Sequence, residues 1–290
     1  MTGVKQVPDS AVPVTESGGN YHSALARLLV DAAARAQLRA APDVTAARFG
    51  LTAAELSQLK AIDAERLEVS AGGITRARTR ALRRLLAITF SLYGPAIEPS
   101  AAAFLAADVP PAGGDEVARS LAAGQRFAAF LATAGGRPAA AEIARLELLR
   151  AELLLSAPAP AAQLEEEPAT RNEGGLLPDV RDSRPAVGAH ARLAAFTVDV
   201  LAPRPGRDPA RWEAPAATRV LLVRPAGSAA VQVSRVSRSV YEVLSRCDGT
   251  RTVAEIRHAV PGRATARDGA PDEVGLLIGS ALEAGLLQLP

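Results

Sequence analysis

The hydrophobic pattern of the chain changes its period partway along the 290 residues. From residue 21 to about residue 156, apolar residues recur every three or four positions, which is typical of helices packed against one another. From about residue 190 they alternate with polar residues, as at Phe196 and Val198, which is typical of strands. A segment with one of these periods cannot bury its apolar residues in the other structure. The sequence therefore predicts an α+β protein in which a helical part precedes a mixed part.

Composition divides the chain into four segments. Residues 1–19 combine Pro, Ser and Gly without a period, which predicts a disordered arm. Residues 20–156 predict an N-terminal α-helical bundle, and residues 157–189, rich in Pro, Gly and Glu, predict a linker. Residues 190–290 predict a second domain with three strands followed by three helices, the order found in a winged helix.

Local signals place starts and breaks within the helical bundle. Thr52 and Glu55 have the spacing of a capping box, in which each side chain pairs with the backbone N–H of the other residue. Gly72 and Gly73 predict an interruption, and a helix over residues 74–93 is expected to follow it. Further helices are expected over about residues 99–107, 114–133 and 138–156.

The second domain contains a predicted hairpin. Residues 220–223 and 231–234 form its strands, and Pro225-Ala-Gly-Ser228 between them is typical of a turn. The first strand is expected around residues 196–201. Three helices are expected over about residues 237–246, from residue 252 onward, and over residues 272–287.

The chain offers few residues for metal or nucleophilic chemistry. It contains one cysteine, Cys247, which we expect to be a small buried residue, and three widely spaced histidines, His22, His190 and His258. No catalytic-triad, phosphate-binding or dinucleotide-binding pattern occurs. No apolar run approaches the roughly 20 residues of a transmembrane helix, and no secretory signal is visible. We expect a non-catalytic, cytoplasmic protein with no cofactor of its own and no contact with a membrane.

The second domain contains a stretch that is specific enough to suggest a family. Cys247-Asp-Gly-Thr-Arg-Thr-Val-Ala-Glu-Ile256 lies at the joint between the first two predicted helices, and Ala281-Leu-Glu-Ala-Gly-Leu-Leu287 ends the third. Residues 219–290 resemble the PqqD-like family, the precursor-peptide recognition elements of ribosomal-peptide pathways. The resemblance implies that an unstructured leader peptide adds as an extra strand beside the third strand, with side chains against the third helix.

The same resemblance implies a set of peptide-binding residues. Leu277 and Leu282 fit either the groove or the core of the domain, and a proline at Gln232 is expected to remove a donor from the receiving edge. The implied contacts are Ala230, Val231, Gln232, Val233, Ser234 and Arg235 on the strand, and Val274, Leu277, Ile278 and Ala281 on the helix.

The helical bundle resembles the helical partner proteins of multinuclear non-heme iron-dependent oxidative enzymes. The matching segments include Ala64-Glu-Arg-Leu67, Leu85-Leu-Ala-Ile-Thr-Phe90 and Gly124-Gln-Arg-Phe-Ala-Ala-Phe-Leu131. The family has more aromatic residues after its Arg-Leu pair than this chain has at Arg66-Leu-Glu-Val-Ser70. Partner proteins of this kind combine a helical domain with a peptide-recognition domain. The resemblance implies a heterodimer in which the iron belongs to the separate enzyme.

Two features are candidates for docking that enzyme. Arg76, Arg80, Arg83 and Arg84 share one face of a predicted helix. This cluster either docks an acidic protein surface, binds phosphates, or is an ordinary solvated face. Trp212, in a Pro-rich connection, either holds that loop against the sheet or belongs to the enzyme interface.

The sequence as a whole predicts a partner protein that binds a leader peptide and presents it to an iron-dependent oxidative enzyme. One alternative is a recognition scaffold for another class of peptide-modifying enzyme. The other is a winged-helix DNA-binding regulator, whose recognition helix would need basic side chains in the major groove. Residues 272–287 contain no Lys or Arg, so nucleic acid is not an expected partner.

Overall fold

The computed structural model describes residues 18–108, 110, 115–134, 136–155, 181–203, 213–260 and 273–289. Helices and strands both occur, which confirms the α+β class. Most of the expected arm and linker, as well as Trp212, lie outside the described residues. The chain divides into two compact units: the first unit comprises Met1–Arg80 and Ala101–Pro111, and the second unit comprises Ala81–Ser100 and Ala112–Pro290.

The first unit is built from short helices with clear local signals. Asp31 separates the first two helices, since its carboxylate accepts hydrogen bonds from the backbone N–H groups of Ala33 and Ala34. The expected capping box of Thr52 and Glu55 is confirmed. The helices are α1 (Gly18–Val30), α2 (Ala32–Ala40), α3 (Pro42–Phe49), α4 (Ala53–Ala61), the first part of α5 (Ala64–Leu85) and most of α7 (Glu98–Ala107).

The interruption expected at Gly72 and Gly73 is wrong. Helix α5 continues through both glycines over 22 residues and ends at Leu85. Two glycines cost only about 1 kcal/mol each relative to alanine in a helix, which the remaining helical residues tolerate. The break falls instead at Leu86, where the chain leaves helical geometry before α6 (Ala87–Tyr93) begins.

A buried carboxylate explains why the chain breaks at this position. Glu147 accepts hydrogen bonds from the backbone N–H groups of Ile88 (2.6 Å) and Thr89 (2.8 Å) and from the Thr89 hydroxyl (2.6 Å). These N–H groups belong to the first turn of α6 and have no partner within that helix. Burial raises the pKa of Glu147, although these hydrogen bonds act in the opposite direction. A residue far away in the sequence thus sets the start of α6.

In the second unit, α6 is followed by the 3₁₀ turn η1 (Gly94–Ile97), α8 (Glu116–Ala132) and α9 (Pro138–Leu155). Helices α8 and α9 pack side by side. Their close approach depends on Gly124, because a Cβ atom there would lie 2.6 Å from Leu148 Cδ2 and 2.7 Å from Leu85 Cδ2.

The sheet of the second unit has three antiparallel strands, β2 (Ala191–Val198), β3 (Pro215–Val223) and β4 (Gln232–Arg235), in the order β2-β3-β4. Strands β3 and β4 form the expected hairpin, with Leu222 opposite Val233. The turn between them uses Gly227 at a φ of 68°. A smaller sheet, not expected from the sequence, pairs β1 (Ala186–Val187) with β5 (Leu287–Gln288).

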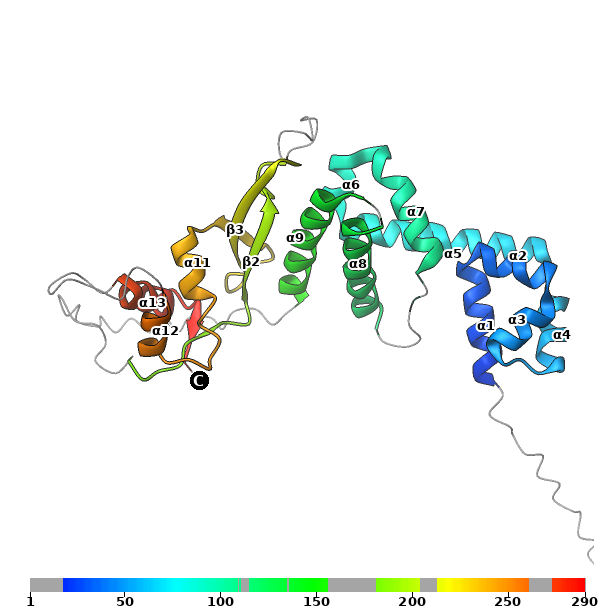
Figure 1. The fold of residues 1–290 in the computed structure, drawn as a ribbon, viewed down its shortest axis with the longest axis horizontal. Helices are drawn as coiled ribbons and strands as arrows, with labels where there is room; N and C mark the ends of the chain where they lie inside the picture. Colours follow the sequence, from blue (N-terminus) through cyan, green and yellow to red (C-terminus); the bar gives the residue numbers. More distant parts are fainter. Residues whose placement is uncertain are drawn as a thin grey trace, which may run out of the picture. The chain divides into compact units, whose positions relative to one another are not determined.

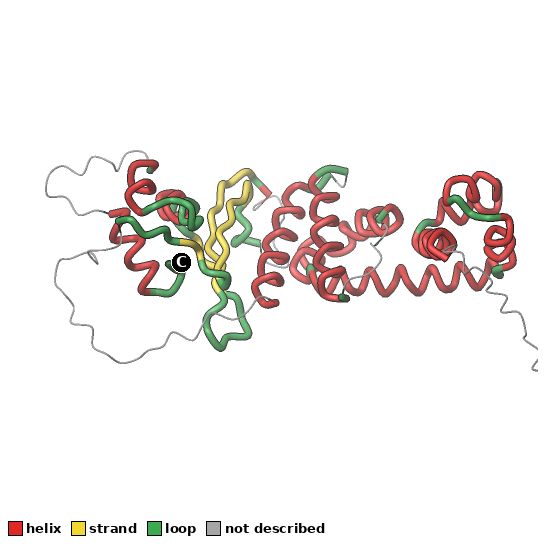
Figure 2. Tube along the Cα trace, turned by 90° about the horizontal axis from the view of Figure 1, so that it is seen from below, coloured by secondary structure: helices red, strands yellow, loops and turns green. Residues whose placement is uncertain are grey.

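Helices cover both faces of the sheet (Figure 1; Figure 2). One face, which includes Phe196, Val220 and Leu222, packs against α9. The guanidinium of Arg145 on α9 lies 4.8 Å from the centroid of the Phe196 ring. On the other face lies α11 (Arg238–Leu244), which contacts β3.

Helix α9 therefore belongs to the same compact unit as the sheet. The sequence-based boundary placed residues 138–156 in the helical bundle because their period is helical. The unit boundary lies elsewhere because the buried face of α9 packs against α6, α8 and the strands. Period identifies the type of an element but not the elements that it contacts.

Three helices follow β4, in the expected order: α11, α12 (Val253–Ala259) and α13 (Glu273–Glu283). Cys247 is buried among them, as expected, and burial raises the pKa of its thiol to about 12. Their shared core consists of Val243, Leu244, Cys247, Val253, Ile256, Val260, Val274, Ile278, Ala281 and Leu287.

Candidate functional site

The outer edge of β4 is the part of the sheet that the sequence singles out. The backbone N–H of Val236 donates to the carbonyl oxygen of Arg219 over 2.9 Å. In an antiparallel pair, residues that exchange backbone hydrogen bonds alternate with residues that do not. Counting back along β4 from Val236, the residues bonded to β3 are Ser234 and Gln232.

The alternate residues, Val233 and Arg235, therefore direct their N–H and carbonyl groups away from β3. Among the described residues, these backbone groups have no hydrogen-bond partner. Arg235 is exposed, while Val233 is half-buried. An incoming extended segment could pair with both residues without displacing any existing backbone hydrogen bond.

This register corrects the expected role of Gln232. Its N–H faces Val223 on β3, so a proline at Gln232 would break the hairpin itself and not the receiving edge. Ser234 likewise faces β3. The sequence does not contain this information, because alternation alone does not reveal which half of the residues bonds inward.

The outer edge of β2 differs, since several of its outward-facing groups already have partners. The carbonyl of Ala195 accepts a hydrogen bond from Arg145 Nη1 over 3.1 Å, and the carbonyl of Ala191 accepts one from Arg192 Nη1 over 2.8 Å. The N–H of Ala191 donates to the carbonyl of Gly188. A strand added here would have to displace two arginine side chains.

An ion pair lies at the far end of the β4 edge. Nη2 of Arg235 contacts both carboxylate oxygens of Asp199, at 2.7 and 2.8 Å. Asp199 also accepts a hydrogen bond from the N–H of Leu201 over 3.2 Å. Burial raises the pKa of Asp199, but the hydrogen bonds from Arg235 and the backbone outweigh it and hold that pKa below its usual value.

The α11 side of the edge is also charged. Nε of Arg238 lies 2.6 Å from a carboxylate oxygen of Glu242, and the guanidinium of Arg219 lies 5.9 Å from the centroid of the Tyr241 ring. The hydrogen bond from Arg238, with the positive charges of Arg246 and Arg219 nearby, lowers the pKa of Glu242. Positive charges thus outnumber negative ones around this strand.

The helical residues expected to line the peptide groove lie elsewhere. Val274, Ile278 and Ala281 are buried in the core that α13 shares with α11 and α12, and Leu277 packs against that core. Ala230 is exposed and Val231 is buried, and both precede the first residue of β4. Helix α11 begins three residues after β4 ends, and it contacts β3, the strand next to β4.

The arginine cluster proposed for docking lies on α5. Arg76, Arg80, Arg83 and Arg84 are all exposed, with the first two in the first unit and the last two in the second. Arg83 donates to Glu98, and its guanidinium lies 5.8 Å from the centroid of the Phe90 ring. These contacts do not test whether the cluster docks an enzyme, so that role stays a prediction. The docking role of Trp212 also stays a prediction.

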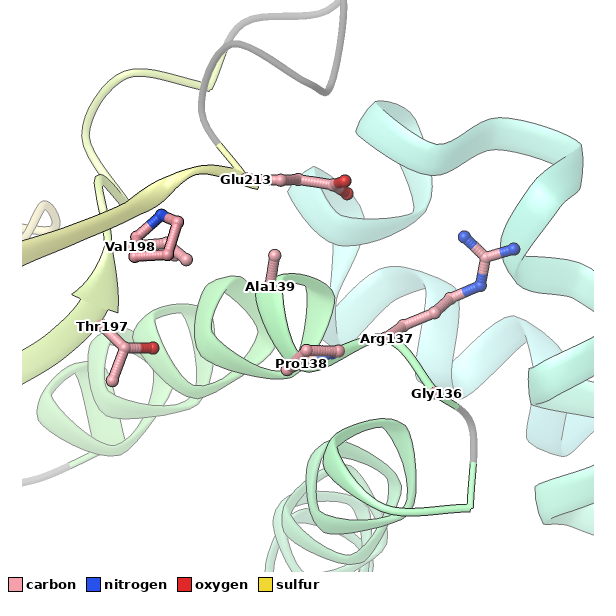
Figure 3. A pocket seen from close by; sticks show the side chains of 8 residues that line it. Gly136, Arg137, Pro138, Ala139, Thr197, Val198 and Glu213 are labelled. Atoms are coloured by element: carbon pink, nitrogen blue, oxygen red, sulfur yellow. The ribbon is translucent and has the colours of Figure 1, made fainter.

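A cavity of about 320 Å³ lies between the start of α9 and the end of β2. Figure 3 shows the charged ends of Arg137 and Glu213 extending away from the strand residues Thr197 and Val198. Burial, followed by the nearby Glu213 carboxylate, raises the pKa of Tyr93. Because the two charged residues have opposite signs, this cavity favours neither an anion nor a cation.

Within the described ranges, no three His, Cys, Asp or Glu side chains gather where they could hold a metal ion. No helix in that part of the chain is both long and apolar enough to cross a bilayer. A scan against models of known protein families found no match, and a search among curated proteins found no relative of this chain. The geometry of the β4 edge is therefore the main indication of function.

Proposed function

We propose that this chain is a non-catalytic, cytoplasmic partner protein that binds the leader of a ribosomally synthesised precursor peptide along β4. It presents the peptide to a separate iron-dependent oxidative enzyme, with which it forms a heterodimer. The observation that supports this proposal most directly is the unpaired outer edge of β4 at Val233 and Arg235. The resemblance of residues 219–290 to peptide-recognition elements supports it independently.

Strand addition explains how such an edge could recognise a peptide. The backbone groups of Val233 and Arg235 supply hydrogen bonds that depend little on sequence, while neighbouring side chains select the peptide. An unstructured peptide loses conformational freedom when it binds, so moderate affinity is expected. Holding the peptide beside the enzyme raises its effective concentration, which is the benefit that a non-catalytic partner provides.

The test is purification of the tagged full-length chain from its native host, with mass spectrometry of bound peptides and metal analysis of bound proteins. The wild-type chain should co-purify with a short peptide and an iron-containing protein. Val233→Pro removes one outward-facing N–H and leaves the β3 hydrogen bonds intact, so it should retain the enzyme but lose most of the peptide. An edge strand tolerates proline at such a position.

A matched control is Ala195→Pro, which removes an outward-facing N–H from β2 instead. It should leave the amount of bound peptide unchanged. If folded Val233→Pro retained peptide at the wild-type level, strand addition at β4 would be wrong. Recovery of DNA in place of an enzyme and a peptide would favour the regulator alternative.

A further inference from the structure

The register of β4 also constrains which peptide can bind, provided that the proposed function holds. We propose that the added segment carries an acidic side chain paired with Arg235 and, two positions away, an apolar side chain against Val233. Both peptide side chains would lie on the face of the sheet that α9 covers. Arg235 is then the residue that determines the charge of the peptide.

The register of β4 determines which face of the sheet the two peptide side chains share. Val233 and Arg235 lie opposite Leu222 and Val220 on β3, whose side chains are buried on the α9 face. A peptide residue that exchanges backbone hydrogen bonds with Val233 or Arg235 stands directly opposite it, with Cβ atoms about 5 Å apart. The two peptide residues opposite them are therefore two positions apart and point to that same face.

The guanidinium of Arg235 has hydrogen-bond donors that no described residue engages. Its Nη2 is bonded to Asp199, whereas its Nε and Nη1 have no hydrogen-bond partner among the described residues. The side chain is 55% exposed. A guanidinium has five donors in a planar fork, so one carboxylate can hold it in place while a second one binds. Asp199 thus acts as a positioning residue.

The charged side chains near β4 favour an acidic residue on the peptide. On the α9 face, Arg235 is the charged group directly opposite the peptide side chain, and its Nε and Nη1 donors, which Asp199 does not engage, favour a carboxylate over an amine. On the opposite face, α11 adds Arg219, Arg238 and Arg246 against the single carboxylate of Glu242, a positive balance that acts on the peptide only at longer range. Opposite charges directly across strands stabilise pairing, and like charges oppose it.

The apolar position of the peptide lies opposite Val233. Val233 is half-buried between two more buried residues, Leu222 opposite it and Val231 two positions before it. The last turn of α9 reaches this end of the sheet, since Arg224 donates to the carbonyl oxygen of Leu154 over 2.8 Å. Leu154 in that turn is 41% exposed. An apolar peptide side chain opposite Val233 would bury the exposed part of Val233 itself.

The direction of the added strand determines the order of the acidic and apolar residues in the peptide sequence. Antiparallel addition places the acidic residue two positions before the apolar one, and parallel addition places it two positions after. The strands of this sheet are all antiparallel, so we expect the acidic residue first.

The experiment uses the full-length chain and a positional-scanning library of acetylated, amidated nonapeptides, read by sequencing of the retained peptides. The wild-type chain should enrich peptides with an acidic residue two positions before an apolar one. Arg235→Glu should reverse the charge preference toward lysine and arginine at the first of these positions, and lower the affinity for acidic peptides about fivefold. Arg119→Glu, at an exposed position of α8, is the matched control and should leave the enrichment unchanged.

Asp199→Asn tests the positioning role. It should reduce the ratio of affinities for an acidic peptide and its amide counterpart, a readout that loss of stability alone would not move. If Arg235→Glu enriched the same acidic peptides as the wild type, or if the wild type enriched no such pair, the inference would be overturned. Strand addition itself is tested separately: Val233→Pro should abolish retention of all peptides, and unchanged retention would contradict the proposed function.

Discussion

The two outer strands of the sheet, β2 and β4, differ in what their outward-facing backbone groups contact. On β2, the side chains of Arg145 and Arg192 bond to two of the outward carbonyl groups. On β4, the outward groups of Val233 and Arg235 have no partner within the described residues. An open edge invites pairing with other chains, and proteins usually protect it.

The difference shows that protection of an edge can come from a helix far away in the sequence. Arg145 lies on α9, which packs against β2 and β3. Its guanidinium also lies over the Phe196 ring and 3.3 Å from a carboxylate oxygen of Glu142, so the side chain is held in place by three contacts. Arginine side chains thus occupy two carbonyl groups on the β2 edge and none of the outward-facing groups on the β4 edge within the described residues, an arrangement that favours strand addition at β4.

Displacement of α9 would remove most of the difference between the β2 and β4 edges. Gly124→Val should do this, because a Cβ at Gly124 would meet the buried side chains of Leu148 and Leu85 at 2.6 and 2.7 Å. We expect the free energy of unfolding to fall by about 3 kcal/mol, as for other overpacked cores. Urea denaturation monitored by circular dichroism measures this change.

Gly73→Ala is the matched glycine control for this measurement. No atom lies within 4 Å of a Cβ atom built at Gly73. This substitution should stabilise α5 by about 1 kcal/mol, since alanine favours a helix over glycine. Equal destabilisation by the two substitutions would contradict the close packing of α8 and α9.

A smaller change would open the β2 edge without displacing α9. Arg145→Ala removes the hydrogen bond to Ala195 and the contact with the Phe196 ring, which should lower the free energy of unfolding by about 1 kcal/mol. The exposed edge should also increase self-association at high concentration, as measured by analytical ultracentrifugation. Arg119→Ala, at an exposed position of α8, should change neither quantity.

The smallest effect concerns the ion pair at the β4 edge. The pKa of Asp199 is lowered in the folded chain, so its stabilising contribution is present above the ordinary value of 3.8 and is lost as the pH falls below that value. The pair is partly exposed, so we expect a contribution of only about 0.5 kcal/mol. The difference in unfolding free energy between wild type and Asp199→Asn should shrink between pH 5 and pH 2.

A difference that stayed constant over this range would show that Asp199 contributes through packing and not through its charge. A difference that grew on acidification would contradict the lowered pKa of Asp199. Either result would remove Asp199 as the group that holds Arg235 in place, while leaving the free backbone edge of β4 unaffected.

The sequence predicted the type of most elements but not their contacts. The hairpin of β3 and β4 could be predicted, because an apolar run and an alternating run flank a turn that contains Gly227. The apolar stripe of α13 could also be predicted, but the elements that it packs against could not. Val274, Ile278 and Ala281 are buried in the core with α11 and α12. The same sequence pattern would be expected if these residues lined a peptide groove.

The sequence by itself determined the α+β class, the capping box at Thr52 and the burial of Cys247, because these depend on local spacing and on residue chemistry. The tertiary structure decided the break at Leu86, since its donors are satisfied by Glu147, far along the chain. It also decided which residues of β4 face outward, because hydrogen-bond register belongs to a pair of strands and not to one strand.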